Sequence, residues 1–313
     1  MKINLNSKYR SFVCNVLLKK GHVSLIIKNY ASLSNVSSRN VKLNNTEIDS
    51  HYFGFEKVSS SEKRDKVQTV FSEVAGKYDL MNDAMSLGIH RLWKDIFIQT
   101  LSPTPGTKLL DVAGGTGDIA FRFLQATLGS RSHDAPNTLQ TEENDTHTNE
   151  SHVVVLDMND KMLSICNERS KEADLQKYLT CIQGNAECLP FQDNSFDAYT
   201  VAYGIRNVVH IDKALNEAHR VLRPGGRFLC LEFSTVKSPT LGRMYDWYSE
   251  EIIPVLGQVI AGNWKAYQYL VESIRKFPDQ EEFSIMIEDA GFSLVLHKNL
   301  LNGISAIHSA YKL

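Results

Sequence analysis

The sequence lacks the features of several common protein classes. Its five cysteines (Cys14, Cys166, Cys181, Cys188 and Cys230) include no Cys-x-x-Cys pair, which favours reduced thiols over a disulfide framework or a zinc site. No apolar run approaches the roughly 20 residues that span a bilayer. The 313 residues, 42% of them hydrophobic, are sufficient for a folded core.

Acidic residues are absent from the first 46 positions, which nevertheless carry a net charge of +8. The whole chain has a net charge of −2, so the remainder carries −10. A basic, Ser- and Asn-rich segment without acids is typical of a mitochondrial transit peptide, and the alternative is a basic tail that touches lipid or nucleic acid. We expect residues 1–50 to be presequence and linker and residues 51–313 to be the folded domain. Because the acidic body has no basic stripe, we expect no nucleic-acid partner.

A glycine-rich loop organises the folded domain. Residues 108–118 (KLLDVAGGTGD) predict a strand, a tight turn and the start of a helix. The loop has no lysine, which a phosphate-binding loop requires, and it lacks the third glycine of the dinucleotide fingerprint. Its spacing, with Gly114, Thr116 and Gly117 in the turn, is the form seen in S-adenosylmethionine-dependent methyltransferases. A plain strand-to-helix turn is the alternative.

The rest of the chain alternates strands with helices. We predict strands at 108–113, 152–157, 179–184, 196–203 and 227–233, and helices at 118–128, 159–171 and 211–222. This alternation predicts a doubly wound, mostly parallel α/β sheet. The last two strand-like runs, 292–300 and 303–311, predict an antiparallel hairpin.

Three further segments fall outside the alternation. Helical patterns at 66–101 and 240–290 predict an N-terminal and a late helical cap, the first of them over the carboxyl edge of the sheet. Residues 129–151 are polar and aperiodic, which predicts a disordered insertion. It connects a helix end to a strand start, so we expect it at the edge opposite the ligand site.

Polar residues follow three of the predicted strands, where the carboxyl ends of parallel strands share one edge. Asp157 ends the second strand and suits the two hydroxyls of a ribose. Asn185 and Ala186, after the third, suit an adenine. After the fourth, Arg206 can hold an anionic oxygen or lower the pKa of a phenol, and Asn207 can position a water or a substrate hydroxyl. Pairing of Arg206 with a structural carboxylate is the alternative.

Five segments (71–79, 110–121, 204–208, 220–233 and 266–275) resemble the ubiquinone/menaquinone biosynthesis C-methyltransferase family. The resemblance runs from about residue 51 to the end. It implies a class I methyltransferase (Rossmann-like) fold, S-adenosyl-L-methionine as cofactor, and methylation of a ring carbon of a polyprenyl benzoquinol lipid. It also places Thr116, Asp157, Asn185 and Ala186 on cofactor-contact positions. Ala202, Tyr203 and Asn263 depart from the family's pattern.

The resemblance further implies a multi-subunit ubiquinone-biosynthesis complex, a homodimer, and peripheral contact with the matrix side of the mitochondrial inner membrane. The uncharged run 252–262 suits a tunnel wall or a membrane-facing surface, and core packing is the alternative. Asp79, Asp83 and His90 are candidate proton acceptors, for each of which a structural role is the simpler interpretation.

Two other functions stay open at this point. A nicotinamide-dependent dehydrogenase is opposed by the glycine spacing and the final hairpin. A non-catalytic scaffold subunit is opposed by the intact loop with Asp157 and Asn185.

Overall fold

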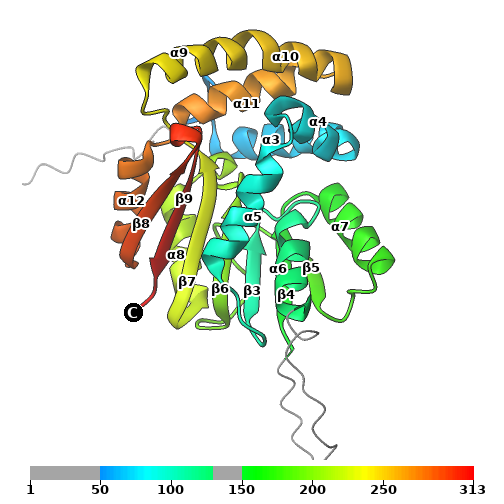
Figure 1. Ribbon diagram of the computed structural model, residues 1–313, viewed down its shortest axis with the longest axis vertical. Helices are drawn as coiled ribbons and strands as arrows, with labels where there is room; N and C mark the ends of the chain where they lie inside the picture. The colour runs from blue at the N-terminus through cyan, green and yellow to red at the C-terminus, as the bar shows by residue number, and fades with distance from the viewer. Residues whose placement is uncertain (1–49, 130–149) are drawn as a thin grey trace, which may run out of the picture. The chain divides into compact units, whose positions relative to one another are not determined.

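The computed structural model describes residues 50–129 and 150–313. Its centre is a seven-stranded sheet in the order β5-β4-β3-β6-β7-β9-β8 (Figure 1). The strands are β3 (Lys108–Val112), β4 (His152–Asp157), β5 (Leu179–Gln183), β6 (Phe196–Ala202), β7 (Leu222–Phe233), β8 (Ser293–Leu300) and β9 (Ser305–Tyr311). Strands β3 to β7 are parallel, and β9 is antiparallel to both β7 and β8. The predicted class I methyltransferase architecture is therefore confirmed.

Helices bury both faces of the sheet. One face carries α5 (Ile89–Leu101), α6 (Asp118–Gly129) and α7 (Asp160–Glu172), and the other carries α8 (Ile211–Val221) and α12 (Gln280–Asp289). Successive residues of β3 show the division, because Leu109 packs with Phe97 and Phe123, whereas Leu110 packs with Leu215 and Phe283. A strand that is buried on both sides favours apolar residues on both faces, which explains Leu109, Leu110 and Val112; the buried Asp111 is the exception.

A helical cap lies above the carboxyl ends of the parallel strands (Figure 1). It consists of α3 (Ser60–Val74), α4 (Tyr78–Ser86), α9 (Pro239–Trp247), α10 (Ile253–Leu256) and α11 (Trp264–Lys276). Val74 and Met81 from the early helices pack with Ile253, Tyr267 and Val271 from the late ones in a separate apolar cluster. The predicted cap is thus confirmed, with two corrections. The helical stretch 66–101 includes α5 and the stretch 240–290 includes α12, but Trp93 and Phe97 of α5 and Phe283 of α12 pack on the faces of the sheet instead.

Short elements connect these parts. A two-stranded hairpin, β1 (His51–Phe53) and β2 (Glu56–Val58), precedes α3 and was not expected from the sequence. Two π-helical turns, η4 (Tyr248–Ile252) and η5 (Gly257–Ala261), flank α10. The final hairpin is confirmed, but its connection is a 3₁₀ turn, η6 (Leu301–Gly303), with Asn302 at φ 59°.

Two of the predicted segments lie outside the described residues. These are the presequence, apart from its last residue, and positions 130–149 of the insertion. The described elements on either side of the insertion, the end of α6 and the start of β4, lie at the amino-terminal edge of the sheet, away from the cap (Figure 1).

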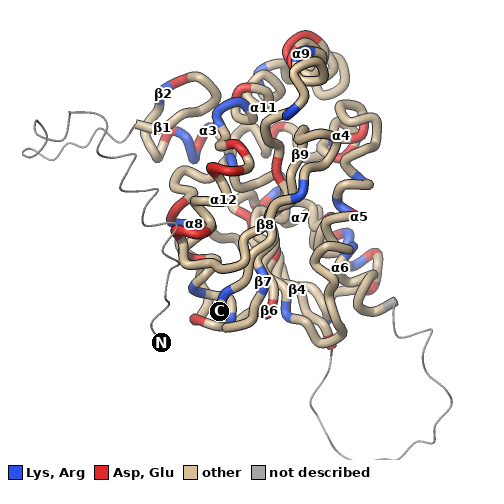
Figure 2. Tube along the Cα trace, turned by 60° about the vertical axis from the view of Figure 1, so that its left-hand side comes forward, with Lys and Arg blue, Asp and Glu red and all other residues tan. Residues whose placement is uncertain are grey.

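Charges of both signs are interspersed along the described chain (Figure 2). Over residues 50–129 and 150–313, no helix has the length and apolar character needed to cross a membrane. The same residues hold no cluster of three or more His, Cys, Asp or Glu suited to a metal ion. The described cysteines are free thiols, of which Cys166 and Cys230 are buried and Cys188 is exposed.

Candidate active site

The glycine-rich loop turns sharply between β3 and α6. Ala113, Gly115 and Gly117 have positive φ values of 52°, 55° and 84°. Glycine adopts this left-handed region of backbone conformation at little cost in free energy. A Cβ on Gly114 would lie 2.8 Å from both Asp111 Oδ2 and Val155 Cγ1. The loop therefore lies directly on the strands beneath it, and the first N–H groups of α6 remain available at its end.

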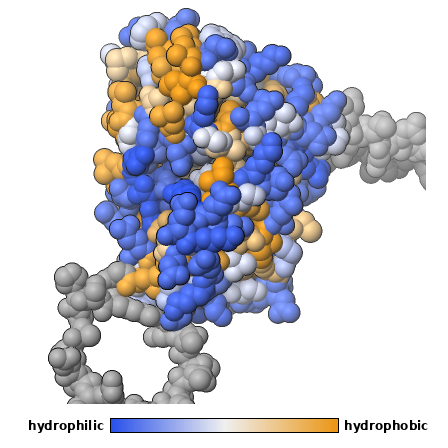
Figure 3. Space-filling model, turned by 90° about the vertical axis from the view of Figure 1, so that its right-hand side faces the viewer, coloured by the Kyte–Doolittle hydropathy of each residue, from blue (hydrophilic) through white to orange (hydrophobic). Residues whose placement is uncertain are grey.

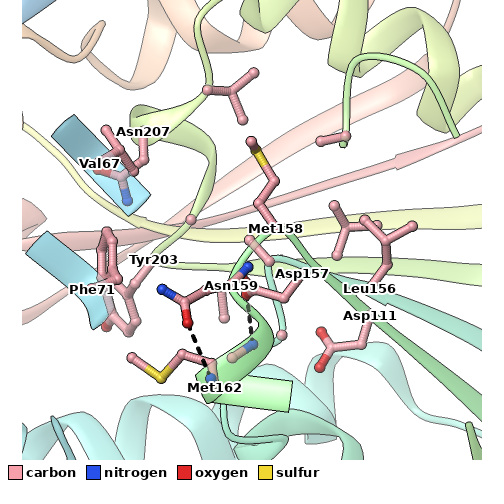
Figure 4. Close-up of a pocket in the computed structure, with 18 of the residues that line it drawn as sticks. Val67, Phe71, Asp111, Leu156, Asp157, Met158, Asn159, Met162, Tyr203 and Asn207 are labelled. Carbon is pink, nitrogen blue, oxygen red and sulfur yellow. Dashed lines mark hydrogen bonds between the residues drawn. The ribbon is translucent and has the colours of Figure 1, made fainter. Parts of the chain in front are cut away.

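One cavity of about 140 Å³ gathers the predicted ligand residues. It is lined by Gly114, Thr116, Asp157, Asn185, Ala186 and Asn207. Figure 4 shows Asn207, Tyr203 and Phe71 of α3 on one side of this hollow and Asp157 on the other. Gly117 does not line it. A Cβ on Gly117 would lie 2.5 Å from Cys166 Sγ, so this glycine shapes the loop from behind.

Asp157 and Asn185 are held in fixed orientations. Asp157 Oδ2 accepts from the backbone N–H of Gly115 at 2.9 Å, and Oδ1 accepts from that of Asn159 at 2.8 Å. Burial raises the pKa of Asp157, while its oxygens keep lone pairs for further hydroxyl donors. Asn185 Oδ1 accepts from the N–H of Glu187 at 3.0 Å, and Ala186 beside it is small and buried. These features fit the ribose and adenine of S-adenosylmethionine.

Asp111 also lines this cavity, although the sequence analysis gave it no role. The residue is fully buried, and its Oδ1 accepts from Thr200 Oγ1 at 2.8 Å. Within the described structure its Oδ2 has no hydrogen-bond partner. Burial raises the pKa of Asp111 to about 7. An acid at the end of an apolar strand was the available sequence signal, and a buried acceptor without a partner fits a ligand that carries a donor group.

A second, larger cavity of about 470 Å³ lies under the cap. Its lining is mostly apolar and includes the aromatic side chains Trp93, Phe233, Tyr245, Trp247, Tyr248, Tyr267 and Tyr269. Phe71, Tyr78, Lys94 and Tyr203 line both cavities. The two cavities thus share a wall, and ligands in each would meet the same four side chains.

Arg206 lines the apolar cavity. It pairs with a structural carboxylate, that of Glu232, which was the alternative interpretation of this residue in the sequence analysis. Its Nη1 donates to Glu232 Oε1 at 2.8 Å and to the Tyr203 carbonyl at 2.6 Å, and its Nε donates to Ser273 Oγ at 3.3 Å. Both side chains of the ion pair are at most 5% exposed. A guanidinium has five N–H donors, so the Nη2 group stays available to a ligand in the cavity.

Asn207 lines the polar cavity and is fixed by the cap. Tyr269 on α11 donates its hydroxyl to Asn207 Oδ1 at 2.9 Å. Phe53 of the N-terminal hairpin stacks on the ring of Tyr269, with centroids 4.1 Å apart. The hairpin therefore supports a site residue, a link that the sequence could not show because 216 positions separate the two rings.

The three candidate proton acceptors have different environments. Asp83 accepts from Arg91 at 2.7 and 2.6 Å and contacts His90 Nε2 at 2.9 Å. Hydrogen bonds from Arg91 and His90 hold the pKa of Asp83 well below its usual range. Asp79 lines the polar cavity, with Arg169 3.7 Å away. Asp83 thus has the structural role that the sequence analysis considered simpler.

Asn263, one of the departures from the family's pattern, has a structural role. Its Oδ1 accepts from the backbone N–H of Ala266 at 3.0 Å and caps α11. Its Nδ2 donates to Glu73 of α3 at 2.6 Å, which ties the late helices to the early ones.

The model of the ubiE/COQ5 methyltransferase family matches residues 58–312. The chain belongs to this family. It is 56% identical to the mitochondrial 2-methoxy-6-polyprenyl-1,4-benzoquinol methylase of Bos taurus and 55% identical to that of Homo sapiens. These alignments cover 85% and 84% of both chains, respectively. The Danio rerio protein of the same name is 53% identical, with 89% of both chains covered.

Solved structures agree at the level of the fold. A SAM-dependent methyltransferase from Thermotoga maritima matches with a TM-score of 0.51 at 17% identity, over 78% of this chain and 99% of that one. One from Methanococcus maripaludis matches with a TM-score of 0.50 at 16% identity, over 76% and 91%. Because it belongs to the ubiE/COQ5 methyltransferase family, the chain is a methyltransferase with S-adenosylmethionine as its cofactor, as the sequence predicted. This finding opposes the dehydrogenase, and the non-catalytic scaffold is not favoured.

The loop geometry predicts different effects for two glycines with similar backbones. Gly117 (φ 84°) faces Cys166, whereas a Cβ on Gly225 (φ 81°) would meet nothing within 4 Å. We expect Gly225→Ala to cost about 1 kcal/mol of unfolding free energy, from backbone strain alone. Gly117→Ala should cost about 2–4 kcal/mol, because overpacking adds to the strain. Thermal denaturation measures both.

Affinity for S-adenosylhomocysteine separates the variants further. Gly117→Ala should weaken binding, because the loop must move away from Cys166, whereas Gly225→Ala should bind as the wild type does. Equal stabilities and affinities in the two variants would contradict this account of the loop.

Proposed function

We propose that this protein transfers the methyl group of S-adenosylmethionine to a ring carbon of a polyprenylated methoxy-benzoquinol in ubiquinone biosynthesis. The observation that carries the proposal is the pair of cavities with a common wall. The polar cavity has groups that match an adenosyl ligand, and the apolar, aromatic cavity suits a quinol ring with the start of a prenyl tail. The names of the curated relatives specify the same substrate.

The chemistry requires a carbon nucleophile aligned with an electrophile. S-adenosylmethionine, when bound, supplies an electrophilic methyl group. The quinol carbon becomes nucleophilic when a hydroxyl on the ring passes its proton to a base or to water, which leaves an anionic oxygen in an apolar cavity. Such an anion is costly without a charged partner. After the methyl transfer, the ring carbon loses its own proton to water and the ring regains its aromaticity. Walls that fix both ligands supply alignment and exclude water.

Arg206 and Asn207 are the residues we propose for these tasks. The Nη2 group of Arg206 would donate to the anionic oxygen, while Glu232 keeps the guanidinium in place. Asn207, whose Oδ1 is held by Tyr269, would offer its amide N–H groups to a substrate hydroxyl or a water. Gly114, Thr116, Asp157, Asn185 and Ala186 would hold the cofactor, with Gly117 shaping the loop.

The prenyl tail requires an apolar exit, and the surface at the mouth of the cavity supports one. Leu87, Met244 and Trp247 line the apolar cavity and are 84%, 61% and 58% exposed. Val255 and Val259 continue this apolar surface along α10 and η5. Figure 3 shows hydrophobic residues gathered at the top of the molecule, over the helical layer. We propose that this surface contacts the membrane that holds the lipid substrate.

The cellular setting is part of the same proposal. The relatives are named mitochondrial, and the basic segment 1–50, whose first 46 residues include no acid, suits a transit peptide. We propose a peripheral position on the matrix side of the inner membrane. A homodimer and membership of a multi-subunit ubiquinone-biosynthesis complex are proposed from the family resemblance.

A methyl-transfer assay tests the proposed reaction. The wild-type protein, S-adenosylmethionine with a labelled methyl group and a short-chain demethyl methoxy-benzoquinol should give a product with the label on a ring carbon, identified by NMR. Asp157→Ala should lower the rate at limiting cofactor, because the ribose loses its acceptor. Absence of incorporation, or a label on oxygen, would contradict the proposal.

Vesicle flotation tests the membrane contact. Val259→Asp places a charge on the apolar surface of the cap and should reduce binding to phosphatidylcholine vesicles about tenfold. Ile285→Asp is the matched control, because Ile285 is 56% exposed on α12, away from that surface. Equal binding by the two variants, or no binding by the wild type, would refute the membrane-facing role.

A further inference from the structure

Lys94 occupies an unusual place for a lysine. It lies on the buried side of α5, its side chain is only 8% exposed, and it lines both cavities. Among the described residues, no other cationic side chain lines both. Burial of an ammonium is costly unless its donors are satisfied. The position of Lys94 therefore needs a physical explanation.

The hydrogen bonds of Lys94 leave part of the ammonium unused. Of its three N–H donors, one is used by Asp118 Oδ2 at 2.6 Å, and residues 50–129 and 150–313 provide no second partner. Asp118 is shared, because its Oδ1 accepts from Arg122 Nε at 3.1 Å. Burial raises the pKa of the Asp118 carboxyl, but Lys94, together with Arg122 and Arg169, holds that pKa below its usual value. The pair fixes the ammonium at the cavity wall with two donors to spare.

The cavity lining indicates which ligand group these donors meet. Asp157, Asn185 and Ala186, at the ends of β4 and β5, fit the adenosine part of the cofactor. The methionine part then falls toward the remaining lining, where Thr116, Asp118 and Lys94 lie beside the start of α6. The twelve-residue helix α6 adds a partial positive charge at its N-terminus. The ammonium of Lys94 and the N-terminus of α6 therefore both favour an anionic ligand group at this part of the cavity.

We propose that Lys94 is a cofactor-binding residue whose ammonium binds the carboxylate of the methionine part of S-adenosylmethionine. Asp118 positions the ammonium for this contact. The buried Asp111, whose Oδ2 has no partner within the described structure, supplies an acceptor for the α-ammonium in the same cavity. The inference rests on the proposed function only for the identity of the ligand.

Calorimetric titration of the full chain with two ligands tests the contact. S-adenosylhomocysteine carries the carboxylate, and 5′-methylthioadenosine lacks the whole amino-acid part. Lys94→Met should weaken binding of S-adenosylhomocysteine by about 10- to 100-fold, the loss typical of a charged hydrogen bond. Binding of 5′-methylthioadenosine should be unchanged. Lys94→Arg should restore part of the lost affinity, because it keeps the charge.

Lys237→Met is the matched control. Lys237 also pairs with a carboxylate at 2.7 Å, that of Glu281, but it lines neither cavity. This variant should bind both ligands as the wild type does. If Lys94→Met does not fold, the affinities for S-adenosylhomocysteine and 5′-methylthioadenosine can be compared in Lys94→Gln, which removes the charge, and in Lys94→Arg, which keeps it.

Two outcomes would overturn the proposal. Equal loss of affinity for both ligands would show that Lys94 only maintains the structure. Unchanged affinity for both, with a lower methyl-transfer rate, would show that the ammonium serves the quinol oxygen instead. A wild-type protein that binds S-adenosylhomocysteine with the predicted Lys94 dependence but does not methylate the quinol would refute the proposed function alone.

Discussion

The parallel pairing of β3, β4, β5 and β6 is the constraint on which the site depends. Val112 pairs with both Leu156 and Val201, and Asp157 pairs with Gln183. This register brings the ends of four strands to one edge, so that the loops after them meet. Residues distant in the sequence, such as Thr116 and Asn185, consequently line one cavity. Burial of both faces of the sheet stabilises the register, because a slip by one residue would move every side chain to the other face.

The second feature is the separation of polar and apolar binding space by a thin common wall. The strand ends make the polar cavity, and the cap makes most of the apolar one. The cap is assembled from both ends of the domain, through the cluster of Val74, Met81 and Ile253 and through the contact between Asn263 and Glu73. A water-soluble cofactor and a lipid can thus approach the same reacting atoms from different sides. The proposed function follows from this arrangement more than from any single residue.

The sequence predicted what is decided locally. The glycine loop, Asp157, Asn185 and Ala186 were predictable, because a strand end fixes the position of the residue that follows it. The apolar strands also identified the sheet. The helix α5 was misplaced because it is apolar enough to suit either the cap or the face of the sheet, and only its packing against Phe123 decides between them.

Pairings across the fold were not predictable in the same way. Arg206 meets Glu232 because β6 and β7 are neighbours, and nothing in the spacing of 26 residues specifies that contact. The support of Asn207 by Tyr269 and Phe53 depends on three segments that only the folded chain unites. The sequence analysis did not identify Asp111 and Lys94 as site residues. Their role was inferred from their burial, and from an acceptor of Asp111 and donors of Lys94 that have no partner among the described residues.

Hydrogen exchange of the backbone amides, measured with and without S-adenosylhomocysteine, tests the central claim that separate strand ends form one binding hollow. The account predicts that the ligand slows exchange together in four segments, 113–118, 157–162, 184–188 and 203–209, while the outer strand β8 is unaffected. Protection confined to one of these segments, or centred on β8, would contradict it.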